Sequence, residues 1–213
     1  MEYKDFIAAI RQKLNDPNDS ISELAKADAL NLCQLEICAE FELLTEIADN
    51  LDVAADGYFD LDANLSNFIA PAHAYYNDKE IFYISLEELS RSNSNWISQI
   101  GTPTSYTLLS GKMRMYPYSG EAETAMLDMV YLKKPLPMTT LHQKPFDGVE
   151  RLEPFHKILL YRTLQYLASN AGMEKKYAIF KAEEEAALER IGDYIESDSH
   201  GHEKASPYEP YKY

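Results

Sequence analysis

The spacing of apolar residues changes twice along the chain, and this change constrains the possible folds more than any other feature of the sequence. Over residues 6–14 and 21–45, apolar side chains recur every three or four positions, as on one face of a helix. Over 51–146 the period becomes two, which is typical of half-buried strands, and from 154 the helical spacing returns. The sequence therefore predicts helices at both ends and a β-rich segment between them.

The helix predicted at 21–45 carries apolar residues on two faces. Its start has the spacing of a capping box, in which Ser20 and Glu23 would satisfy backbone N–H groups. One stripe consists of Ile21, Leu24, Leu32, Leu35 and Ala39, and the other of Leu30, Cys33, Ile37, Phe41 and Leu44. Because a helix that is apolar on two faces needs cover on both, we expect it to lie at the centre of a bundle.

Turn-forming residues divide the β-rich segment. Asp56-Gly57 suits the positive φ angles of a type I′ turn, so a hairpin is expected there, and 77–79 predict a second hairpin with a longer loop. A helix is expected over 86–100. After it, three strands are expected to form an antiparallel meander, over 106–109, 112–118 and 125–133.

Two more helices are expected near the C-terminus. Pro154 fits the first turn of one, and Gly172 is expected to end or bend it. The other runs from Glu174 to about Ile195. Its glutamates are expected to face solvent or a neighbour rather than to form a catalytic carboxylate pair, namely Glu183, Glu184, Glu185 and Glu189.

Together these patterns predict an α+β fold. Residues 1–50 and 150–196 are expected to form a helical bundle, and 51–149 a small antiparallel β-rich subdomain with one helix, inserted into that bundle. Residues 197–213 have no periodicity and contain prolines, so we expect an extended C-terminal tail. The tail is either inert or docks its aromatic side chains into a partner, and the candidate docking residues are Pro207, Tyr208, Pro210, Tyr211 and Tyr213.

The charge and hydropathy of the chain narrow the choice of partners. Lysine and arginine number 20 against 35 aspartates and glutamates, a net charge of −15, so a dedicated nucleic-acid binder is not expected. No apolar run is long enough to cross a bilayer, and the first residues lack the pattern of a secretory signal, so we expect the protein to stay in the cytosol where it is made. The 16 tyrosines suit protein interfaces.

No motif of a common enzyme class occurs, and we expect neither a cofactor nor a metal. Cys33 and Cys38 lie five positions apart on one predicted helix, so we interpret them as buried thiols rather than a disulfide or zinc site. His200 and His202 with Asp198 or Glu203 have metal-ligand chemistry, but in an acidic tail they are interpreted as solvated.

Two other candidates for chemistry have simpler interpretations. His156 with Glu153 has the spacing of an acid–base pair, but a hydrogen bond on the protein surface is favoured. Trp96 offers a stacking surface for a sugar or base, but lacks basic neighbours, so a core or interface anchor is favoured.

Short patterns in the middle of the chain resemble a known family. Gly101, Pro103 and Tyr106 are followed by a turn and an apolar strand that ends in Pro117, and Tyr131 and Pro135 mark a second strand end. This arrangement resembles the head-to-tail adaptor, or connector, proteins of tailed bacteriophages, particularly those with short tails. The downstream helix at 155–166 also resembles that of the family, and the likeness spans nearly the whole chain.

The resemblance implies a structural, non-enzymatic protein of the virion. Such a subunit would form a ring, typically of about twelve copies, beneath the portal protein. The ring would extend the DNA channel and carry tail or nozzle proteins, with DNA passing through without specific binding and with no membrane involved. The protein would act at the head–tail junction after assembly in the host cytoplasm. Its C-terminal tail would engage the portal, a neighbouring subunit or a tail protein.

Two alternatives stay open. One is a tail or neck completion protein, which would bind tail components but not an isolated portal. The other is a small hydrolase or ligand-binding domain that uses a cleft with His156 or His73.

Overall fold

The computed structural model describes residues 1–15 and 21–199, and the side chains of 1–15 and 21–192. The chain forms two compact units, each with its own apolar core. The helical unit combines Met1–Leu44 with the described residues from Lys134 onward, and the sheet unit is Thr45–Lys133.

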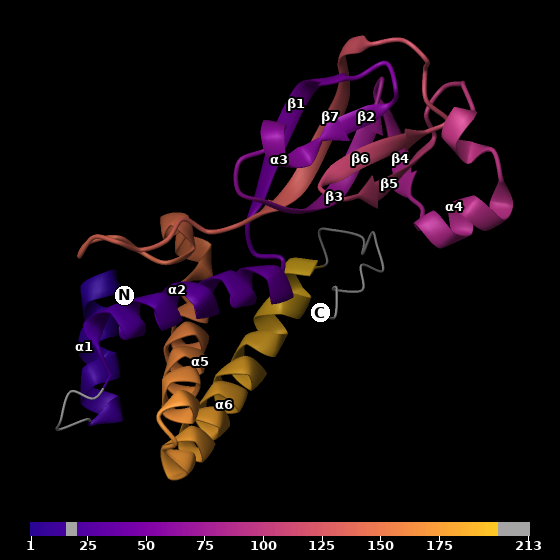
Figure 1. Ribbon diagram of the computed structural model, residues 1–213. Helices are drawn as coiled ribbons and strands as arrows, with labels where there is room; N and C mark the ends of the chain where they lie inside the picture. The colour runs from indigo at the N-terminus through magenta and orange to yellow at the C-terminus, as the bar shows by residue number, and fades with distance from the viewer. Residues whose placement is uncertain (16–20, 200–213) are drawn as a thin grey trace. The chain divides into compact units, whose positions relative to one another are not determined.

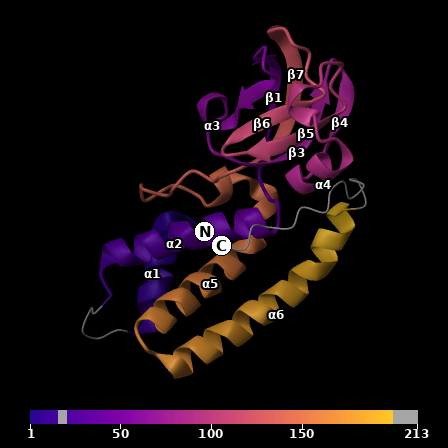
Figure 2. The same cartoon turned by 45° about the vertical axis from the view of Figure 1, so that its right-hand side comes forward.

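Four helices build the described part of the helical unit (Figure 1). They are α1 (Tyr3–Leu14), α2 (Glu23–Glu40), α5 (Phe155–Asn170) and α6 (Glu174–Ser199). The turn between α5 and α6 contains Gly172 at a φ of +66°, a conformation that glycine adopts without strain. As a result, α5 and α6 run side by side in opposite directions (Figure 2). The shared core includes Phe6, Leu30, Ile158 and Leu164, all fully buried.

The loop that leads into α5 lies against α2 and is held there by two amide side chains. Asn31 donates to the Met138 carbonyl (3.2 Å) and accepts from its N–H (2.8 Å). Gln34, itself buried, donates to the Leu136 carbonyl (3.1 Å) and accepts from the Phe146 N–H (3.1 Å). The loop carries two short 3₁₀ turns, Phe146–Gly148 and Glu150–Leu152. These bonds satisfy backbone groups that would otherwise be buried without a partner.

Seven strands form the sheet unit, in the order β1-β7-β3-β4-β5-β6-β2. The strands are β1 (Thr45–Val53), β2 (Tyr58–Asp60), β3 (Phe68–Tyr76), β4 (Lys79–Tyr83), β5 (Ser105–Leu109), β6 (Lys112–Tyr116) and β7 (Glu123–Lys133). All paired neighbours are antiparallel except β4 and β5. The connections contain α3 (Leu61–Asn64), α4 (Leu86–Ser92) and the 3₁₀ turn Trp96–Ser98.

The two ends of the strand order approach each other, so the sheet is nearly closed. The last residues of β1 and the first of β2 are joined by a tight turn, in which Ala54 N–H donates to the Tyr58 carbonyl (3.1 Å). Gly57 sits in that turn with a φ of +75°. A sheet that curls back on itself encloses its own core, which here contains Phe59, Met113, Leu127 and Met129.

The predicted fold class, a helical bundle with a small antiparallel β insertion, is therefore wrong. The sheet is a full unit, it is mixed rather than antiparallel, and it begins at Thr45, within the range 1–50 that is expected to belong to the bundle. Of the predicted meander, the antiparallel pairing of β5 with β6 is confirmed, but its third strand is wrongly placed, because β7 pairs with β1 and β3 rather than with β6. Alternation and turn residues identify strands, but they do not choose partners that are distant in sequence.

The two predicted hairpins have different outcomes. The second is confirmed: β3 pairs with β4, with Tyr76 opposite Lys79 and both turn residues, Asn77 and Asp78, at positive φ. At the first, the turn at Asp56-Gly57 exists, but β1 pairs along β7 and β2 along β6. The helix expected over 86–100 ends at Ser92.

Candidate functional site

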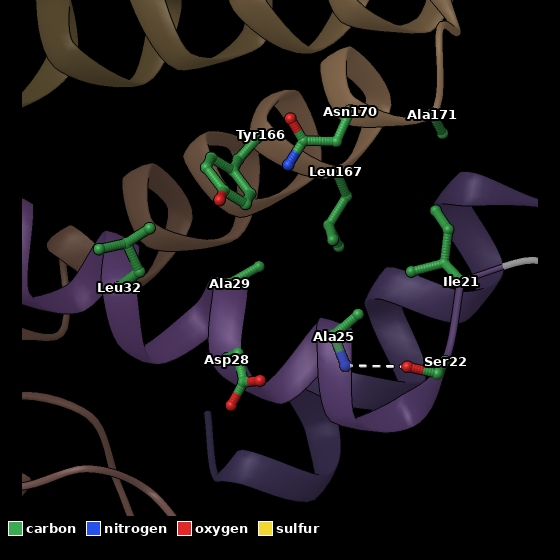
Figure 3. Close-up of a pocket in the computed structure, with 10 residues that line it drawn as sticks. All are labelled: Ile21, Ser22, Ala25, Asp28, Ala29, Leu32, Tyr166, Leu167, Asn170 and Ala171. Atoms are coloured by element: carbon green, nitrogen blue, oxygen red, sulfur yellow. Dashed lines mark hydrogen bonds between the residues drawn. The ribbon is translucent and has the colours of Figure 1, made fainter.

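An open groove lies between α2 and α5 (Figure 3). It has a volume of about 780 Å³. Its lining residues are Ile21, Ser22, Ala25, Asp28, Ala29 and Leu32 from α2 and the residues just before it, and Tyr166, Leu167, Asn170 and Ala171 from α5 and its C-terminal cap. All of these residues belong to the helical unit, so the groove is formed by one compact part of the chain.

The spacing of the α2 residues explains the shape of the groove. Positions 25, 28, 29 and 32 fall on one face of α2, and Ile21 lies just before the helix. Ser22 starts the helix by accepting the Ala25 N–H at 3.1 Å. Ala25 and Ala29 have short side chains and leave space between the two helix backbones. Figure 3 shows Leu167 pointing from α5 toward α2 and the ring of Tyr166 standing beside it.

Large apolar side chains at and beside the groove are exposed. Tyr166 is 41% exposed and Leu32 38%, while Leu24, one turn along α2 from Asp28, is 71% exposed. The opposite stripe of α2 is buried, with Leu30, Cys33 and Ile37 at 0%. The expectation that both faces of this helix are covered is therefore wrong for the described residues, since one apolar face stays open.

A polar network with its buried end at Glu184 connects the α5 wall to α2 and α6. Arg162 of α5 donates to Glu184 of α6 (Nε to Oε1, 2.6 Å) and to Glu40 of α2, and Gln165 also donates to Glu184. Glu184 is 8% exposed. The expectation that this glutamate faces solvent or a neighbour is wrong, because a buried guanidinium needs a carboxylate partner. Glu183 and Glu185 are exposed.

The polar groups of the groove suit recognition of a peptide. Asp28 accepts hydrogen bonds, the Asn170 amide both donates and accepts, and the Ser22 and Tyr166 hydroxyls add further capacity. They surround an apolar floor, and a few polar groups around apolar lining are typical of sites that bind extended or helical segments.

The candidate acid–base residue His156 lies inside the helical unit. Only 7% of it is exposed, and its ring lies between Phe6 and Phe146, with centroids 5.9 and 6.1 Å away. The Met1 amino group donates to its Nδ1 at 3.0 Å. Burial, with the nearby positive amino group, lowers the pKa of His156 to about 4. The surface position expected for this histidine is wrong.

The second candidate histidine, His73, lies on the sheet unit. Its Nδ1 is 3.1 Å from Glu80 Oε1, and both side chains are more than one third exposed. They line a hollow of about 510 Å³ with Tyr106, Phe82 and Tyr83. His73 and His156 belong to different units, so the structure gives no geometry that joins them.

Most residues of the family-like pattern serve the interior of the sheet unit. Tyr106 and Tyr131 are 5% and 3% exposed and belong to its core. The Gly101 N–H donates to the Tyr118 carbonyl (2.9 Å), and a side chain at Gly101 would meet Pro117 at 3.3 Å. Pro103 and Pro135 are buried, with Pro135 in the helical unit. Only Gly101 and Pro117 form a local pair, and the set as a whole forms no single site.

Three other candidate residues, Cys33, Cys38 and Trp96, are buried. Cys33 and Cys38 are buried free thiols, as predicted, and burial raises the pKa of each to about 12. Trp96 is 8% exposed, which places it as an internal anchor. Among the described residues, no cluster of three histidine, cysteine or carboxylate side chains is arranged to hold a metal ion.

Over residues 1–15 and 21–199, no helix has the length and apolarity needed to cross a membrane.

Several residues singled out in the sequence lie outside the described part of the chain. They are Ser20, the two histidines with metal-ligand chemistry, His200 and His202, and the tail residues expected to dock, Pro207, Tyr208, Pro210, Tyr211 and Tyr213.

Comparison with known proteins yields one family. The family model described as SU10 adaptor protein matches residues 1–206, which include both units and the groove. No curated protein matches the chain.

Proposed function

Because this chain belongs to the SU10 adaptor protein family, a family of structural phage adaptors, we propose that it is a subunit of a head-to-tail adaptor ring. The ring binds the portal protein, extends the DNA channel and carries tail or nozzle proteins. The family match over residues 1–206 is the observation that supports this most strongly, and it confirms the resemblance found in the sequence.

The exposed face of α2 supports an assembly role. A subunit of a closed ring must present two different complementary surfaces to its neighbours. Leu24, Leu32 and Tyr166 are large, exposed and close to a groove, and exposed apolar patches of this kind mark interaction sites. The ring is proposed to contain about twelve copies.

The net charge supports a passive DNA channel. At −15 per chain, a ring would repel phosphates along its wall, whereas basic walls would hold DNA through counterion release. DNA is therefore proposed to pass without specific binding, and no cofactor is required. The ring would lie at the head–tail junction of the virion after assembly in the host cytoplasm.

The C-terminal segment is proposed as the docking arm of the subunit. Pro207 and Pro210 favour an extended backbone, and Tyr208, Tyr211 and Tyr213 provide apolar surface with a polar tip. The receptor for this arm is the portal or a neighbouring subunit.

The first test is to quantify this polypeptide against the portal protein in purified virions by mass spectrometry. About one copy per portal subunit is expected for a ring that matches the portal. Absence from the virion would contradict the proposal and would favour an enzyme. Binding of purified chain to isolated portal, measured by sedimentation, distinguishes the adaptor from a tail or neck completion protein, which would bind tail components alone.

A further inference from the structure

The groove between α2 and α5 is apolar, open and uncovered by any described part of the chain. Ala25 forms part of its exposed wall, and Leu24, Leu32 and Tyr166 stand around it at 71%, 38% and 41% exposure. Exposure of large apolar side chains to water is unfavourable compared with their burial. An occupant with apolar side chains would remove that cost.

Residues 207–213 have the chemistry that such an occupant needs. The segment reads Pro-Tyr-Glu-Pro-Tyr-Lys-Tyr, so three aromatic rings alternate with prolines that favour an extended backbone. Asp28 is the single charged residue that lines the groove, and Lys212 lies between two of the tyrosines. Lys212 can therefore pair with Asp28, while tyrosine hydroxyls can bond to Asn170.

The length of the chain argues against occupancy by the same molecule. Helix α6 runs antiparallel to α5, so its first turn lies by Asn170 and its end at Ser199 lies about 38 Å away, at 1.5 Å per residue. Pro207 follows Ser199 by eight residues, which span about 27 Å when fully extended. Within one chain, the segment would reach the groove only with a taut connection, which favours an adjacent copy as its source.

This inference rests on the proposed function: we propose that the groove receives Pro207–Tyr213 of an adjacent copy of this chain. Each subunit then offers its arm to one neighbour and its groove to the other. This is a head-to-tail contact, which closes into a ring when the rotation between copies permits.

The first test measures binding of a fluorescently labelled synthetic peptide of residues 200–213 to the full chain by anisotropy. We expect saturable binding that is weakened at least about tenfold by Ala25→Arg, which fills the exposed wall of the groove with a long charged side chain. Ala182→Arg is the matched control, because Ala182 is also an exposed helical alanine but lies on α6 outside the groove. A peptide with all three tyrosines replaced by serine should not bind.

Equal binding by the two arginine variants would overturn the proposal. Unfolding curves of both variants in urea check that each is folded.

The second test asks which molecule supplies the arm. One preparation carries Ala25→Cys and another Tyr211→Cys, and they are mixed under mild oxidation on isolated portal. Cys33 and Cys38 are at most 1% exposed and have a raised pKa, so they stay unreactive. A disulfide-linked pair of chains is expected only in the mixture. If a chain with both substitutions forms an internal disulfide instead, the assignment to an adjacent copy is wrong.

These outcomes are independent of the proposed function. Peptide binding in the groove without any association with the portal would refute the adaptor role and leave the groove assignment standing. A normal portal-bound ring of the Ala25→Arg variant would refute the groove assignment and leave the adaptor role standing.

Discussion

Arg114 is held between two tyrosine rings and fixes a loop of the sheet unit. Its guanidinium carbon lies 4.6 Å from the Tyr58 ring centroid and 4.4 Å from that of Tyr118. Its Nη2 donates to the Ile97 carbonyl at 2.7 Å, and only 3% of the residue is exposed. A planar guanidinium stacks on both rings while it keeps this bond, and a lysine ammonium does not.

We therefore expect Arg114→Lys to lower the free energy of unfolding by about 1–3 kcal/mol, through lost stacking and a weakened buried hydrogen bond. The measurement is urea unfolding followed by circular dichroism. Arg91→Lys is the control, because Arg91 forms an exposed pair with Glu87 and such pairs contribute about 0.3–0.5 kcal/mol. Equal effects of the two substitutions would contradict the role given to the stack.

His156 predicts a pH dependence of stability. Burial first, and the nearby amino group second, lower its pKa to about 4 from the ordinary histidine value of 6.5. Between these two values the unfolded chain binds the proton and the folded chain does not, so stability falls as the pH drops from 6.5 toward 4. The full shift corresponds to a ceiling of about 3 kcal/mol, and we expect roughly 2.

The check compares unfolding free energies of the wild type and His156→Phe across this pH range. Phenylalanine keeps a ring between Phe6 and Phe146 but cannot titrate, so the difference between the two proteins should shrink with falling pH. A constant difference would show that His156 is protonated equally in both states.

Single residues were predictable from the sequence only where local spacing decides their position. Cys33 was interpreted as a buried thiol from its place on an apolar helical stripe, and it is buried. The burial of Arg114 has no signal in the local apolar spacing, because one ring partner, Tyr58, is distant in the chain and the other, Tyr118, lies beyond the end of β6. The sequence favours a surface position for His156, because local spacing does not reveal that the remote residue Phe6 packs against its ring.

At the scale of elements, the local sequence predicts turns better than it predicts which strands pair. Asn77 and Asp78 adopt positive φ in a two-residue turn, and the strands they join pair directly. Gly57 also turns the chain at positive φ, yet β1 pairs along β7 and β2 pairs along β6. Long-range pairing is decided by which faces can be buried together, and this information is spread over the whole sheet.

One glutamate of a run of three forms the polar contacts between α5 and α6. Glu184 accepts from Arg162 and Gln165, so Glu184→Ala leaves a largely buried guanidinium with Glu40 alone. We expect this substitution to destabilise the protein by about 2–3 kcal/mol. Glu183→Ala and Glu185→Ala remove exposed carboxylates and should change stability by less than about 0.5 kcal/mol. Thermal and urea unfolding of the three variants provide the comparison.

At the scale of the whole molecule, the sequence indicated an assembly protein without locating its surfaces. Tyrosine content and net charge are visible in composition. The groove is not, because it needs α5 to lie beside α2 with Tyr166 next to Leu32. The second apolar stripe of α2 was a partial signal, which was attributed to the core of the bundle rather than to a partner.

Charge and groove together predict how self-association depends on salt. Copies that each carry −15 repel one another, while the proposed contact through the groove is mainly apolar. Raising the ionic strength from about 0.01 M to about 1 M shortens the Debye length from about 30 Å to about 3 Å. Repulsion is then screened while apolar burial is retained, so association should strengthen with salt.

Sedimentation velocity at fixed protein concentration measures this directly, and Ala25→Arg should weaken association at every salt concentration. Association that weakens as salt is added would mean that ion pairs, rather than the apolar groove, hold the copies together.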